Sequence, residues 1–202
     1  MRIAPAVAAL ALAGAPAFAQ TSAPAGAYVN DPTHTSVEWR GKHQGLSTYS
    51  ARFTKVSIEL DFNEADISKS KVNATIEAKS IETDFLRTRP AADKRDFNEE
   101  LIGDKAFNAA KFPTITFKST KITKTGANTG TATGDLTFMG VTKPVTLNIT
   151  YNGNRPDPRI QKHKVGFSAT TTLKRSDFGM TFAAAAVADD IQVLIESELR
   201  QK

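Results

Sequence analysis

Two polar side chains fall on faces of the chain that are otherwise apolar. His43 follows Val37 and Trp39 in period-two alternation, and Arg175 ends an apolar row over residues 165–173. An isolated charge in an apolar interior is strongly unfavourable, so a buried Arg175 needs a partner. These two residues are the strongest candidates for a role beyond a plain core.

Two roles are open for them. In the first, His43 and Arg175 line the mouth of a cavity and receive an anionic or carbonyl head group. In the second, Arg175 pairs with nearby Asp177 at the strand end, and His43 is a hydrogen-bonded structural histidine.

The residue types give little support for a metal site, a catalytic site or a cofactor site. There is no Cys, which excludes disulfides, thiolate metal sites and thiol nucleophiles. The histidines His34, His43 and His163 lack ligand-like spacing, so we expect no metal site. Ser47 lies four residues after His43 without a nucleophile elbow or an orienting acid, so we expect no catalytic residues. No glycine loop or dinucleotide fingerprint predicts a cofactor.

The elements that must position these side chains are strands. Period-two alternation with β-branched residues predicts about eight of them, at 37–43, 47–61, 72–79, 112–124, 129–139, 145–151, 165–175 and 191–199. Turn signals separate them, at 63–70, 125–128, 139–140, 152–158 and 176–179. Only 90–108 breaks the pattern, and its Ala, Asp, Glu and Lys content predicts one or two short helices in a long connection.

The fold class is therefore all-β, antiparallel and eight-stranded. Alternation alone does not choose between a sandwich and a closed barrel. A slip of phase after Phe53 predicts a bulge or bend near Thr54, which favours a barrel. The formal net charge is +5, but basic residues alternate with acidic ones and Thr, so we expect a solvated surface and no nucleic-acid partner.

The N-terminal residues predict export. Arg2, an apolar run and Ala17-Phe18-Ala19 are typical of a signal peptide over 1–19, cleaved between Ala19 and Gln20. Residues 20–26 read as a flexible tether, and 27–202 as one domain. With no Cys to carry a lipid anchor, we expect the mature protein in the periplasm or secreted.

Several stretches in order resemble the YceI-like family of periplasmic lipid-binding proteins, over about residues 28–202. They are Asp31-x-x-His34-x-x-Val37, His43-x-Gly45-x-Ser47, Ser80-Ile81-x-Thr83, the run 107–120, Gly134–Val145 and Lys174–Met180. The resemblance implies an eight-stranded lipocalin-like barrel associated with isoprenoid lipids, including polyprenyl pyrophosphates and quinones. The chain departs from the family pattern at Ala51, where members have Gly, and in the longer run 95–101.

We therefore expect a carrier that holds an isoprenoid-type lipid inside the barrel. The shared phase of inward residues predicts a cavity wall with His43 and Arg175 at one end. The wall includes Val37, Trp39, Ile76, Phe117, Phe167 and Leu173. Two alternatives remain: an enzyme acting on such a lipid, and a solidly packed stress protein that binds a protein partner.

Overall fold

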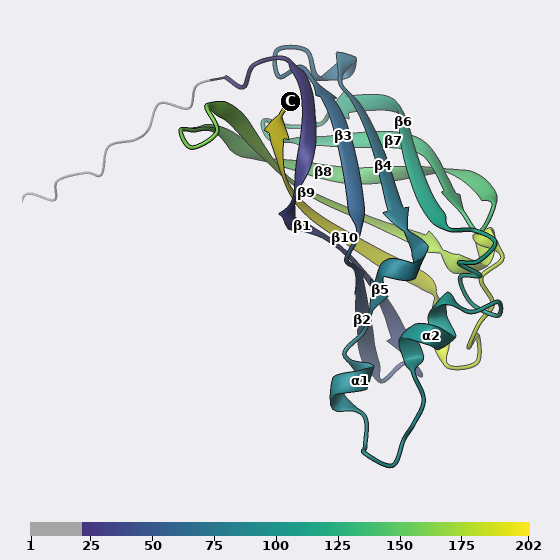
Figure 1. Cartoon of the computed structure of the whole chain (residues 1–202). Helices are drawn as coiled ribbons and strands as arrows, with labels where there is room; N and C mark the ends of the chain where they lie inside the picture. Colours follow the sequence, from purple (N-terminus) through teal and green to yellow (C-terminus); the bar gives the residue numbers. More distant parts are fainter. Residues whose placement is uncertain (1–21) are drawn as a thin grey trace, which may run out of the picture.

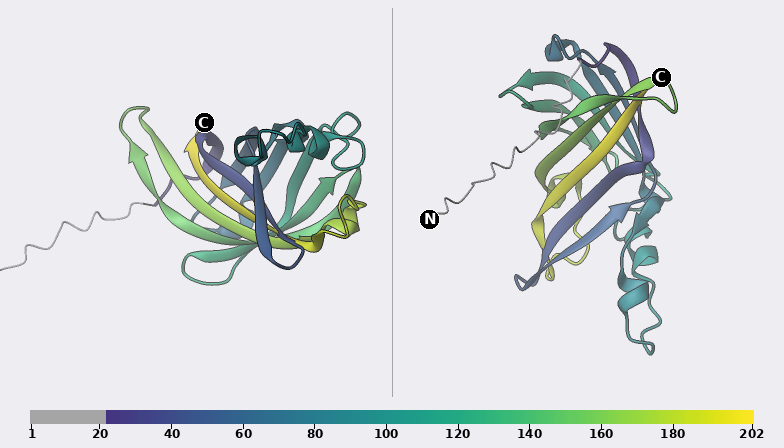
Figure 2. Two further views of the ribbon diagram at one scale, coloured as in Figure 1. Left: turned by 90° about the horizontal axis from the view of Figure 1, so that it is seen from below. Right: turned by 90° about the vertical axis from the view of Figure 1, so that its left-hand side faces the viewer.

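The computed structural model describes residues 22–202, and they form one antiparallel sheet of ten strands (Figure 1). The sheet order is β10-β9-β8-β7-β6-β4-β3-β1-β2-β5, and β10 also pairs with β1. That last pairing closes a ring of eight strands, which Figure 2 shows as a sheet that curves round until β10 meets β1. The strands are β1 (Gly26–His43), β2 (Ser47–Phe53), β3 (Val56–Phe62), β4 (Lys71–Glu77), β5 (Ile81–Glu82), β6 (Thr114–Lys124), β7 (Thr129–Phe138), β8 (Val141–Asp157), β9 (Lys162–Lys174) and β10 (Val187–Gln201).

The long strand β1 explains why the sheet has ten strands although only eight of them form the closed barrel. Its first residues pair with β3, whereas Val37–His43 pair with β2. The chain leaves β2 at Phe53 and enters β3 at Val56, so the sheet divides at Thr54. The predicted break near Thr54 is confirmed, and the segment predicted as one strand serves as two.

Local sequence explains the tight connection between β7 and β8. Met139 and Gly140 have φ angles of 50° and 77°, the pair of positive values that a two-residue hairpin turn requires. A side-chain carbon added at Gly140 would also lie 2.6 Å from the Phe112 ring. This position therefore needs glycine for its backbone and for its packing.

One connection differs from the expectation. The signal at 152–158 is not a turn, because β8 continues to Asp157 and the hairpin turn follows it. A register shift between Tyr151 and Gly153, with φ of 120° at Gly153, absorbs these turn-prone residues within the strand.

The helices lie in and just before the expected connection. Helix α2 (Phe97–Ile102) falls inside 90–108, and Asp96 caps it by accepting hydrogen bonds from the N–H groups of Asn98 and Glu99. Helix α1 (Phe85–Thr88) precedes that range. Both helices lie at the end of the molecule where β2 projects, away from the C-terminus (Figure 1). Three short 3₁₀ turns complete the elements: η1 (Ile67–Lys69), η2 (Ala78–Ser80) and η3 (Arg175–Phe178).

The segment before β1 packs against the barrel. Ala23 is buried and its N–H donates to the Glu64 carboxylate. The Tyr28 hydroxyl donates to the Pro24 carbonyl at 2.7 Å. The described part of the expected flexible tether is therefore held in place by these contacts. The predicted signal peptide, its cleavage site and residues 20–21 lie outside the described residues.

Within residues 22–202, we find no helix with the length and apolar character needed to cross a membrane.

Candidate ligand-binding cavity

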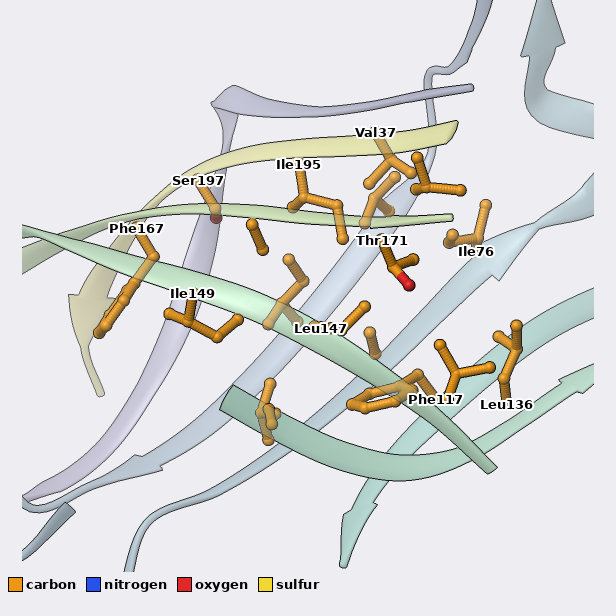
Figure 3. A pocket seen from close by; sticks show the side chains of 18 of the residues that line it. Val37, Ile76, Phe117, Leu136, Leu147, Ile149, Phe167, Thr171, Ile195 and Ser197 are labelled. Carbon is orange, nitrogen blue, oxygen red and sulfur yellow. The ribbon is translucent and has the colours of Figure 1, made fainter. Parts of the chain in front are cut away.

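A cavity of about 630 Å³ lies inside the ring of strands. Each of the eight barrel strands contributes side chains to its wall, because every second residue of a strand points inward. Figure 3 shows apolar side chains from several strands converging on this space, among them Val37, Phe117, Leu147 and Ile195. The wall is thus built by the same alternation that defines the strands.

Most of the predicted wall residues lie where the pattern placed them. Six apolar side chains and Arg175 line the cavity, and the contact of each with a ligand stays a prediction. The six are Val37, Trp39, Ile76, Phe117, Phe167 and Leu173.

His43 is the exception. Its side chain is exposed and is not part of the cavity wall. The alternation was read correctly, but β1 continues beyond the cavity to a hairpin at Gln44 and Gly45, whose φ angles are 50° and 71°. The expected place of His43 at the cavity mouth is therefore wrong.

Arg175 lies at one end of the cavity as the first residue of η3. It is 6 % exposed, and its guanidinium joins the loop between η3 and β10 to the first residues of β10. Nε donates to the Ala188 carbonyl at 3.1 Å, Nη2 to the Val187 carbonyl at 2.8 Å, and Nη1 to the Phe182 carbonyl. Three backbone acceptors therefore satisfy this buried cation.

The expected pairing of Arg175 with Asp177 is wrong. Asp177 instead accepts from Lys143 Nζ at 3.2 Å on the surface. Among the residues the structure describes, no carboxylate lies within ion-pair distance of Arg175. Backbone carbonyls close to the strand end satisfy the guanidinium, so a side-chain partner is not required.

The other end of the cavity is polar as well. Glu64 and Tyr151 both line it, and the Tyr151 hydroxyl accepts from Asn154 Nδ2 at 2.9 Å. Burial is the main reason that the pKa of Tyr151 rises to about 12, with Glu64 contributing in the same direction. The phenol is therefore neutral over the physiological range. Sequence reasoning missed Glu64, which falls in a predicted turn.

A charged cluster lies beside the barrel, around the buried amino group of Lys164. Its Nζ is 3.3 Å from Asp157, 3.5 Å from Glu198 and 3.8 Å from Asp31. His34 also contacts Asp31, at 3.1 Å, and the ligand atoms of Asp31, His34 and Glu198 lie within 4.8 Å of one another. The lysine already supplies the positive charge that these carboxylates need, so we interpret the cluster as a structural ion-pair network.

The comparisons with known proteins agree with this architecture. Residues 28–199 match the YceI-like domain. The chain belongs to the YceI-like family. A UPF0312 protein of Pseudomonas aeruginosa is 34 % identical over 194 residues, which are 95 % of each chain.

Two solved structures share the fold of this YceI-like chain. BcnA of Burkholderia cenocepacia superposes with a TM-score of 0.71 and 25 % identity, over 84 % of this chain and 98 % of BcnA. A polyisoprenoid-binding domain from Saccharophagus degradans gives a TM-score of 0.60 at 12 % identity, over 89 % of this chain and all of that domain. The second likeness shows the fold alone.

Proposed function

We propose that this protein is a carrier that holds an isoprenoid-type lipid, a polyprenyl pyrophosphate or a quinone, inside the barrel. The observation that carries the proposal is the apolar cavity of about 630 Å³ enclosed by eight strands. A volume of this size falls in the range of small-molecule sites. The Saccharophagus degradans domain that shares this fold is a polyisoprenoid-binding domain, which agrees with the proposed ligand class.

The shape of the cavity suits a slender chain. Wall residues on β10 run from Val187 to Leu199, which is roughly 40 Å along a strand. A strand tilt of about 40° turns this into roughly 30 Å along the barrel axis. Burial of a hydrocarbon chain gains about 0.8 kcal/mol per CH₂ before the costs of binding, so a long tail supplies a large driving force.

The two alternatives fit the cavity less well. An enzyme needs a matched acid–base pair facing the substrate, and His43 lies outside the wall. A packed-barrel protein needs interdigitated side chains, which a void of about 630 Å³ contradicts. The binding role therefore has the stronger physical support.

We also propose that the carrier works in the periplasm. This rests on the signal-peptide pattern in residues 1–19 and on the absence of a Cys for lipid attachment. A chain of tens of carbons is nearly insoluble in water, so its transfer through the periplasm requires a protein that covers it.

Mass spectrometry of solvent extracts tests the proposal. Protein is expressed with its full leader and purified from the periplasm without detergent, and we expect a polyprenyl lipid in the extract of the wild type. Ala169→Phe, which places a ring in the cavity, should lose that lipid, whereas Thr170→Phe on the outer face of the same strand should keep it.

Two results would contradict the proposal. Equal extracts from wild type and Ala169→Phe would show that any lipid is a surface contaminant. An intact mass that includes Met1, in place of one that begins at Gln20, would contradict the periplasmic part alone.

A further inference from the structure

One buried hydroxyl in the cavity wall has no hydrogen-bond partner among the residues that the structure describes. Nine polar or charged residues are buried in the described chain, and eight of them make side-chain hydrogen bonds or ion pairs. The ninth is Thr171, which is 9 % exposed and has no side-chain hydrogen bond to any residue of 22–202. A buried hydroxyl without a partner is unfavourable, so Thr171 requires an explanation.

The surroundings of Thr171 are apolar. Ala169 and Leu173 precede and follow it on the same face of β9, and Val193 is opposite it on β10. The side chain of Thr171 points into the cavity (Figure 3). The indole Nε1 of Trp39 is also unpartnered, but that atom is fully enclosed by protein. The Thr171 hydroxyl is not enclosed in this way, so a molecule in the cavity can reach it.

The geometry points to Thr171 as the residue that selects a neutral, oxygen-bearing head group inside the barrel. This inference rests on the proposed function and narrows it to lipids with a carbonyl or hydroxyl, such as a prenyl quinone. A hydroxyl can donate to a carbonyl or accept from another hydroxyl, and either bond satisfies both partners.

A charged head group does not fit this position. One hydroxyl among apolar side chains cannot offset the dehydration of a pyrophosphate. Arg175 lies four residues further along, roughly 13 Å away on strand geometry, and three of its N–H groups already bind carbonyls. The interior of the cavity is therefore suited to an uncharged polar group.

Three probes with the same twenty-carbon branched skeleton, saturated in the hydrocarbon and unsaturated in the other two, test this selection. They are phytane, a tetraprenyl naphthoquinone and geranylgeranyl pyrophosphate, each titrated by displacement of a fluorescent naphthylamine. Thr171→Val keeps the shape of the side chain and removes the hydroxyl, and Thr171→Ser keeps the hydroxyl. We expect Thr171→Val to lose about tenfold in affinity for the quinone and to bind phytane unchanged. Thr171→Ser should bind the quinone within about threefold of the wild type.

The outcomes separate this inference from the proposed function. If the wild type binds none of the three probes, the proposed function itself fails. If the wild type binds them but Thr171→Val keeps its quinone affinity, or loses phytane equally, the selective role of Thr171 fails. A wild type that prefers the pyrophosphate to the quinone overturns the neutral head group.

Discussion

Two cations are buried within residues 22–202, and the protein stabilises them in opposite ways. Lys164 is 8 % exposed and has three carboxylates around it, from β1, β8 and β10. Arg175 is 6 % exposed, and the backbone carbonyls of Phe182 and of the first two residues of β10 accept its hydrogen bonds. The first arrangement neutralises charge, whereas the second satisfies donors and leaves the charge without a paired carboxylate.

The difference follows from the shapes of the two side chains. A guanidinium presents five N–H groups in a rigid plane, which can reach several carbonyls of one loop at once. An ammonium is a compact point charge, and it is best stabilised by oxygens that surround it. The Arg175 contacts therefore shape a loop at the cavity end, whereas the Lys164 contacts join three strands beside the barrel.

Loss of the Arg175 side chain should have the largest effect. Arg175→Ala leaves the carbonyls of Phe182, Val187 and Ala188 without their donor, and we expect a loss of about 3 kcal/mol in the free energy of unfolding. For a chain of this length that is a fall of roughly 6–12 °C in melting temperature. Arg175→Lys should recover only part of it. Lys174→Ala, which removes an exposed cation next in sequence, should cost less than about 1 kcal/mol.

Lipid titration of the same variant decides between fold and head-group roles for Arg175. We expect equal changes for a quinone and a pyrophosphate, because the guanidinium serves the loop. A selective loss of ten- to a hundred-fold for the pyrophosphate would instead make Arg175 a head-group contact.

Removal of the Lys164 amino group should have the next largest effect. Lys164→Met leaves Asp31, Asp157 and Glu198 close together without their shared cation, and we expect a loss of about 2 kcal/mol at neutral pH by urea unfolding. Lys162→Met, two residues earlier on the same strand and exposed, is the matched control. Equal stabilities for the two variants would show that the cluster contributes nothing.

Alternation predicted the wall of the barrel because it depends only on neighbouring residues. Val37, Ile76 and Phe167 alternate with polar residues, and each points inward as the period of a strand requires. The break near Thr54 was also visible, since a bulge changes the phase of the pattern. Leu147 on β8 also lines the wall, although it was not among the predicted wall residues.

The alternation pattern alone could not predict how far each strand extends or which side chains contact one another across the sheet. His43 has the right phase, but only the structure shows that β1 continues beyond the cavity. The partners of Arg175 are backbone carbonyls, and every residue has one, so the residue types do not show which carbonyls accept. Lys164 meets Asp31 because of the register between strands far apart in the chain, and that register is set by the closed barrel.

Acid should weaken the carboxylate cluster around Lys164 before it weakens the contacts of Arg175. The pKa of Asp157 is lowered to about 2, chiefly by the hydrogen bond from the Arg159 side chain, with a further contribution from Lys164. The pKa of Asp31 is also lowered to about 2, chiefly by the Thr33 hydroxyl.

The direction in which stability changes with pH follows from the number of protons that the folded and unfolded states bind. An unfolded Asp titrates near pH 4, so between about pH 4 and pH 2 the unfolded chain binds more protons than the folded one. The stabilisation from both residues is therefore complete above about pH 4 and is lost as the pH falls toward 2.

Urea unfolding at steps across this range should show a steady decline in the free energy of unfolding of the wild type. Asp157→Asn should decline less steeply, whereas Asp190→Asn, which removes an exposed carboxylate from β10, should follow the wild type. Parallel curves for all three proteins would show that the Lys164 cluster does not set the acid sensitivity.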